Sequence, residues 1–74
     1  MNERIAEAIR LSHTEIVAAA AAKLGRELSP EERAGIERVT SLMMLESIHR
    51  AFTFEQTPAA QVEEDLQYYA SRSA

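Results

Sequence analysis

The sequence predicts an all-α protein, built from an antiparallel helical hairpin and a short third helix. Apolar residues recur at the three- and four-residue steps that place them on one face of a helix. Each expected helix also begins or ends at a recognisable capping residue. No alternating pattern typical of a strand is present, and 74 residues allow a single helical domain over residues 1–74.

The first helix is expected over about residues 2–24. Its apolar face carries Ile5, Ile9, Ile16, Ala20 and Leu24. The alanine run at residues 18–22 has the highest intrinsic helix propensity and lets another helix approach closely. Gly25 is expected to end the helix, because glycine adopts the left-handed conformation without a Cβ clash.

A second helix is expected over about residues 30–54. Ser29 is a good N-cap, Pro30 suits the first helical position, and Glu32 completes a capping box. With a length close to that of the first helix, this segment forms the second arm of the hairpin. Thr57-Pro58 repeats the cap-plus-proline pattern and predicts a third helix over about residues 58–70.

Apolar side chains surround the second helix on nearly every side. Between Val39 and Phe54 the only charged residues are Glu46 and Arg50, so one partner helix cannot cover the segment. A monomer of this size also buries only about 60% of the surface that its unfolded chain exposes. We therefore expect a homodimer or higher oligomer, forming a four-helix-type bundle, or burial against another protein. The expected interface residues are Val39, Leu42, Met43, Met44, Leu45, Ile48, Phe52 and Tyr68.

Composition excludes several classes of function. The formal net charge of −4 and the absence of a basic cluster argue against nucleic-acid binding. Without cysteine there are no disulfides or thiolate metal sites. The longest apolar run, residues 16–22, is too short to span a membrane, and no signal peptide is recognisable, so we expect a cytoplasmic protein. The sequence contains no phosphate-binding loop and no nucleophile elbow, which are motifs that would indicate an enzyme.

One polar motif on the second helix could bind a metal. Glu46 and His49 form a Glu-x-x-His spacing, which resembles the motif of the dinuclear sites in ferritin-like bundles. That resemblance implies iron or another divalent metal and, as the one enzymatic possibility, a di-metal oxidase or ferroxidase. The further candidate ligands are His13, Glu7 and Glu15. Alternatively, Glu46 and His49 are a polar pair at the edge of the core, or His49 is a pH-sensitive residue of an interface.

A second motif surrounds Ser41. Thr40-Ser41-Leu42, with the Met-Met-Leu-Glu that follows, is similar to the Asp-Ser-Leu motif of acyl carrier proteins, whose serine carries phosphopantetheine. Those proteins hold the serine at a helix N-terminus after a Gly/Asp loop. The predicted helix instead places Ser41 about ten residues inside, as a small residue at a helix contact.

The sequence therefore predicts a small acidic helical protein that self-associates and binds another protein as a regulatory or accessory factor. No cofactor, nucleic acid or membrane is expected as a partner. Met43-Met44 could provide an adaptable binding surface, and Tyr68 could anchor an interface. The alternative is the ferritin-like metal-binding bundle that uses Glu46 and His49.

Overall fold

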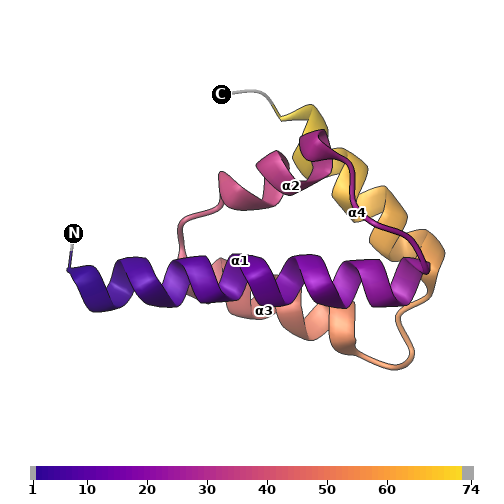
Figure 1. The fold of residues 1–74 in the computed structure, drawn as a ribbon. Helices are drawn as coiled ribbons and strands as arrows, with labels where there is room; N and C mark the ends of the chain where they lie inside the picture. The colour runs from indigo at the N-terminus through magenta and orange to yellow at the C-terminus, as the bar shows by residue number, and fades with distance from the viewer. Residues whose placement is uncertain (1, 73–74) are drawn as a thin grey trace.

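The computed structural model describes residues 2–72, and this part of the chain is entirely helical and loop, without a strand. Its four helices are α1 (Glu3–Leu24), α2 (Pro30–Glu37), α3 (Leu42–Thr53) and α4 (Ala59–Ser71), shown in Figure 1. The all-α prediction is confirmed. Among the described residues, no helix combines the length and apolar character needed to cross a membrane.

Helix α1 follows the sequence prediction closely. The Asn2 side chain accepts a hydrogen bond from the Arg4 backbone N–H at 2.7 Å and caps the helix N-terminus. At the other end, Gly25 adopts the left-handed conformation, with φ of 69°, and its N–H donates to the Ala21 carbonyl. Ile16 and Ala20 on the predicted apolar face are completely buried. Ile5, at the end of that face, is 44% exposed because α1 extends beyond the other helices there (Figure 1).

The prediction of one continuous helix over residues 30–54 is wrong. The capping box forms as expected, with the Ser29 hydroxyl accepting from the Glu32 N–H, but α2 ends at Glu37. Residues 38–41 interrupt the helix: two β-branched residues, Val39 and Thr40, precede Ser41, which caps α3 by accepting from the Met44 N–H at 3.3 Å. The break reverses the chain direction and returns α3 to the side of α1 (Figure 1).

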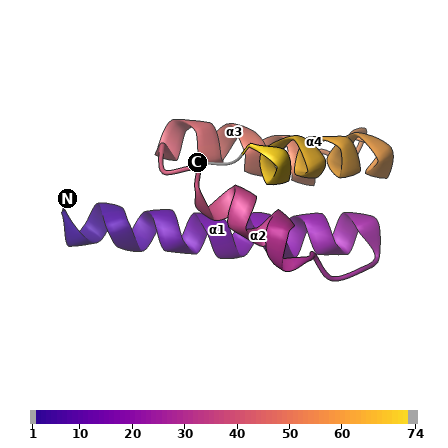
Figure 2. The same cartoon turned by 90° about the horizontal axis from the view of Figure 1, so that it is seen from above.

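Helices that are not adjacent in the sequence make the most extensive contacts. Helix α1 packs mainly on α3, and α2 mainly on α4 (Figures 1 and 2). The α1–α3 pair is parallel, because His13 contacts Val39 before α3 begins, and Lys23 contacts Phe54 just after α3 ends. Helix α2 runs back along α1, so the predicted hairpin exists with a much shorter second arm.

One core joins all four helices. Its fully buried large side chains are Phe52, Ile16, Ile36, Leu45, Leu66 and Val62. Leu28 in the α1–α2 connection is also buried, at 4% exposure. The chain therefore covers Leu45, Ile48 and Phe52 with its own helices, which removes the need for a second chain to bury them.

The α4 start differs in detail from the prediction. The helix covers Ala59–Ser71, close to the expected residues 58–70. However, Pro58 itself occupies the N-cap position and no side chain caps the helix, whereas the sequence suggested that Thr57 would do so. The Thr57 carbonyl instead accepts a hydrogen bond from Lys23 Nζ at 2.9 Å, which ties the α3–α4 connection to α1.

Candidate binding pocket at the α2–α3 break

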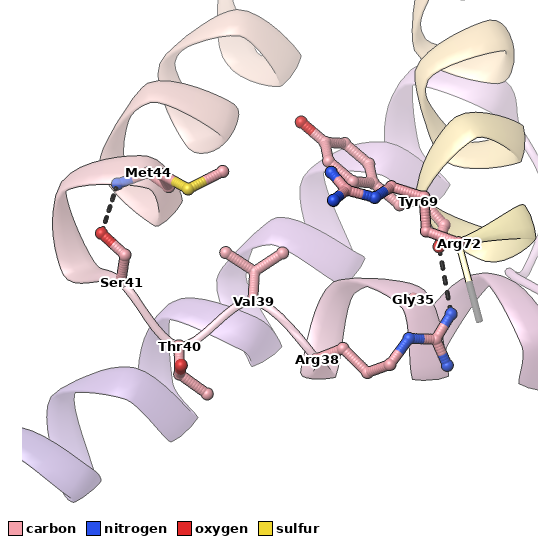
Figure 3. Close-up of a pocket in the computed structure, with 8 residues that line it drawn as sticks. All are labelled: Gly35, Arg38, Val39, Thr40, Ser41, Met44, Tyr69 and Arg72. Atoms are coloured by element: carbon pink, nitrogen blue, oxygen red, sulfur yellow. Dashed lines mark hydrogen bonds between the residues drawn. The ribbon is translucent and has the colours of Figure 1, made fainter. Parts of the chain in front are cut away.

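A pocket of about 400 Å³ opens where α2 ends, α3 begins and α4 ends (Figure 3). The interruption of the predicted helix creates it, because residues 38–41 form one wall and the last turn of α4 forms the opposite wall. Its lining residues are Gly35, Arg38, Val39, Thr40, Ser41, Met44, Tyr69 and Arg72. The volume is in the range of about 300–1,000 Å³ typical of ligand pockets.

The apolar part of the pocket consists of Val39, Met44 and Tyr69. Val39 and Tyr69 pack against the edge of the core, whereas Met44 is 48% exposed. The Tyr69 ring also meets the Tyr68 ring edge-to-face, with centroids 5.5 Å apart. Burial raises the pKa of the Tyr69 phenol, and the nearby Asp65 contributes to this.

The ionisable side chains of the lining, apart from Tyr69, are both cationic. Arg38 donates from Nη2 to the Tyr69 carbonyl at 3.1 Å and to the Ala70 carbonyl at 3.4 Å, which holds it against the C-terminal turn of α4. Arg72 donates from Nη1 to the Tyr68 hydroxyl at 3.2 Å. No carboxylate within residues 2–72 forms a salt bridge with either arginine.

Ser41 lies at the mouth of this pocket and is exposed. Its expected position inside a helix is wrong, because it is the N-cap residue of α3. The error follows from the continuous helix assumed over residues 30–54. The serine of the motif that resembles acyl carrier proteins therefore does stand at a helix N-terminus, with Thr40 before it where those proteins have aspartate.

The structure divides the eight expected interface residues into three groups. Leu45, Ile48 and Phe52 belong to the core of the single chain. Val39 and Leu42 are partly buried against that core. Met43, Met44 and Tyr68 are 78%, 48% and 56% exposed, and they are the members of the set that a partner could reach.

The five candidate metal ligands do not meet within one chain. His13 donates from Nε2 to the Val39 carbonyl at 2.7 Å, and Glu7 pairs with Arg10 on the surface of α1. Glu15 and Glu46 are exposed and His49 is half-buried. Among the described residues, no three histidine, aspartate or glutamate side chains are grouped as metal ligands.

An ionic network centred on the buried carboxylate of Glu32 links α2 to α4, and sequence reasoning missed it. Glu32 is only 3% exposed, and its carboxylate accepts from Arg26 at 3.0 Å and from Gln67 Nε2 at 2.7 Å. Arg26 also pairs with Glu63 of α4. Hydrogen bonding and charge from Arg26 lower the pKa of Glu32 to about 2. The capping box identified Glu32 but gave no signal for its ionic partner.

No family model matches the sequence, and comparisons with curated proteins and with solved structures give no match. The residues of the pocket and the exposed apolar side chains around it are therefore the features from which a function can be proposed.

Proposed function

We propose that this chain is a protein-binding module that acts as a regulatory or accessory factor. The observation that carries the proposal is the open pocket at the α2–α3 break, where Met44 and Tyr69 offer apolar surface beside exposed polar groups. Methionine adapts its shape to different partners, and tyrosine combines a large contact area with a hydroxyl group. A partner that inserts a side chain there would cover Met44, which the chain leaves about half exposed.

Self-association is a separate prediction, and it now depends on different residues. Met43 projects from the side of α3 opposite the core and is 78% exposed. A second copy that packs on this side of α3 would cover it. The large buried residues of α3 no longer support this prediction, since α1 and its neighbours already cover them.

Photo-crosslinking tests both predictions in one experiment. A benzophenone amino acid replaces Met44 in one variant, Met43 in a second and Ala18 in a third, where Ala18 is an exposed control position on α1. Irradiation in the source cells should give a discrete adduct from position 44 with a different protein. An adduct of twice the chain's own mass from position 43 would support self-association.

The control decides how the adducts are interpreted. Position 18 should give no discrete adduct, because Ala18 is exposed on α1 and does not line the pocket. Equal labelling from positions 18 and 44, or no adduct from position 44, would contradict the proposed docking site. A monomer by sedimentation at micromolar concentration, with unchanged helicity, would contradict self-association.

A second candidate function follows from the position of Ser41. An exposed serine at a helix N-terminus, in a sequence similar to the acyl carrier motif, favours attachment of phosphopantetheine to its hydroxyl. Co-expression with a phosphopantetheinyl transferase, followed by intact-mass measurement, tests this function. The chain should gain the mass of the group, and Ser41→Ala should not. A wild-type chain that remains unmodified would contradict this candidate.

A further inference from the structure

We propose that the pocket at the α2–α3 break recognises an acidic segment of the partner protein. In this arrangement an apolar side chain of the segment lies on Met44 and Tyr69, and a neighbouring carboxylate binds Arg72 and Arg38. The inference rests on the proposed protein-binding function and specifies the chemistry of the partner.

The distribution of charge is the first argument. The chain contains 12 acidic and 8 basic residues, yet the pocket lining includes two arginines and no acidic residue. The lining of this pocket is therefore a positively charged surface on an acidic protein. Such a surface attracts a negatively charged segment and disfavours a basic one, because like charges that meet in an interface repel each other.

The positions of the two arginines are the second argument. Hydrogen bonds to the Tyr69 and Ala70 carbonyls fix the Arg38 guanidinium at the pocket wall without neutralising its charge. Arg72 lies at the end of α4, with its guanidinium 5.5 Å from the centroid of the Tyr68 ring, and Figure 3 shows it beside Tyr69. A guanidinium presents paired N–H donors that match the two oxygens of a carboxylate.

The combination of surfaces is the third argument. Apolar contact alone would suit many hydrophobic segments, and charge alone would suit any anion. The pocket places Met44 on the side opposite Arg72, so one ligand must satisfy both surfaces (Figure 3). A peptide with an aspartate or glutamate close to a large apolar residue does so. The extended backbone of such a peptide can also continue out of the pocket through its open side. A compact, rigid ligand makes no use of that opening.

A random dodecapeptide library displayed on phage provides the probe. The library is selected on the immobilised full chain after depletion on the Met44→Asp variant, which removes the apolar surface and adds a negative charge beside the two arginines. We expect the enriched peptides to share an acidic residue within a few positions of a large apolar residue. An enriched peptide is then synthesised together with its counterpart in which glutamine or asparagine replaces the acidic residue.

Binding is measured by fluorescence anisotropy against variants with matched charge. Arg72→Gln and Arg4→Gln each remove one positive charge, but Arg4 lies on α1 far from the pocket. We expect Arg72→Gln to weaken binding about five- to tenfold, the loss typical of a charge-assisted hydrogen bond, and Arg4→Gln to change it less than about twofold. The amide counterpart of the peptide should lose a similar factor and become insensitive to Arg72→Gln.

The possible failures separate this inference from the proposed function. Some peptides could bind the wild-type chain and not Met44→Asp, with an affinity that Arg72→Gln leaves unchanged. This result would overturn the specificity for acidic segments and leave the proposed protein binding in place. Enrichment of peptides without acidic residues would do the same. If no peptide is enriched over Met44→Asp, both the inference and the proposed docking site are contradicted.

Discussion

The two helix pairs of this protein are held together by different forces. Helices α1 and α3 meet mainly through apolar residues, among them Ile16, Leu45 and Phe52, all almost fully buried. Helices α2 and α4 also contribute to the core, but they add a buried carboxylate, Glu32, with an arginine and a glutamine bound to it. The α2–α4 pair further requires a glycine, because Gly35 packs directly on the backbone of α4.

This difference predicts that the two pairs respond to different perturbations. Burial of apolar surface depends on shape and is insensitive to pH. An ionic network in a buried position depends on protonation and leaves a large penalty when one member is removed. The pocket has one wall from each pair, so changes in either pair should alter its shape.

The largest effect is expected from Phe52→Ala in α3. Phe52 is 1% exposed, and its truncation leaves a cavity between the helices, at a cost of about 3–5 kcal/mol of unfolding free energy. That is a large part of the about 4–11 kcal/mol expected for a domain of this size. Urea denaturation followed by circular dichroism measures the change. The matched control is Phe54→Ala, which removes a ring that is 55% exposed and should cost less than about 1 kcal/mol. Similar losses for both variants would contradict the assigned core.

A glycine comparison tests the close contact between α2 and α4. A Cβ at Gly35 would lie 2.7 Å from the Tyr69 carbonyl carbon and oxygen and 2.8 Å from the Ala70 nitrogen, so α4 must move. Gly35→Ala should destabilise the fold by about 1–3 kcal/mol. Gly25→Ala meets no atom within 4 Å and loses only the preference for positive φ, at about 1 kcal/mol. The two midpoints in thermal unfolding provide the comparison, and a Gly35→Ala midpoint above that of Gly25→Ala would refute the close approach.

Acid should weaken the network at α2 and α4. The pKa of Glu32 falls from 4.5 to about 2 in the folded chain, so its ionised form stabilises the fold fully above the unfolded value. This stabilisation is lost as the pH decreases from about 5 to about 2, because protonation then favours the unfolded state.

The Glu32→Gln variant isolates this contribution. It should lose about 1–3 kcal/mol at neutral pH, since Arg26 and the capping box lose their charged partner. Its stability should also depend less on pH between 5 and 2 than that of the wild-type chain. Glu31→Gln is the control, because Glu31 is exposed in the same helix turn. Parallel pH profiles for the wild type and Glu32→Gln would disprove the role of this carboxylate.

The smallest effect is expected from Lys23→Met. Lys23 donates to the Phe54 carbonyl at 2.8 Å and to the Thr57 carbonyl at 2.9 Å, which satisfies backbone acceptors beyond the end of α3. Loss of these hydrogen bonds at a partly exposed site should cost about 0.5–1.5 kcal/mol. Hydrogen exchange of the amides in residues 53–57 should increase more than exchange in α2. Uniform acceleration throughout the chain would show that Lys23 has no local role.

The sequence was most informative where local chemistry determines the structure. The glycine stop at Gly25 and the capping box at Ser29 depend on neighbouring residues only, and both are confirmed. The break at residues 38–41 was missed because an apolar run favours helix continuation, while the capping ability of Ser41 becomes decisive only when α3 can pack on α1. The packing of α3 on α1 therefore determines that Ser41 caps a new helix instead of continuing α2.

The candidate pocket could not be predicted from the sequence, because it also depends on tertiary packing. Arg38 and Arg72 are 34 positions apart in the chain, and only the α2–α4 packing brings them to one cavity. Met44 and Ser41 were both singled out from the sequence, but as parts of one long helix they had no common site. The positive charge of the pocket comes from Arg38 and Arg72, which belong to no local sequence motif.

The pairing of α1 with α3 and of α2 with α4 has a consequence for how the protein forms during translation. Neither pair is a continuous piece of the chain, since α2 separates the members of the first pair and α3 separates those of the second. A nascent chain that ends before residue 42 thus exposes the apolar face of α1, and the stable packing of these four helices must await the synthesis of α4. Folding of this part of the chain then follows the emergence of α4 from the ribosome.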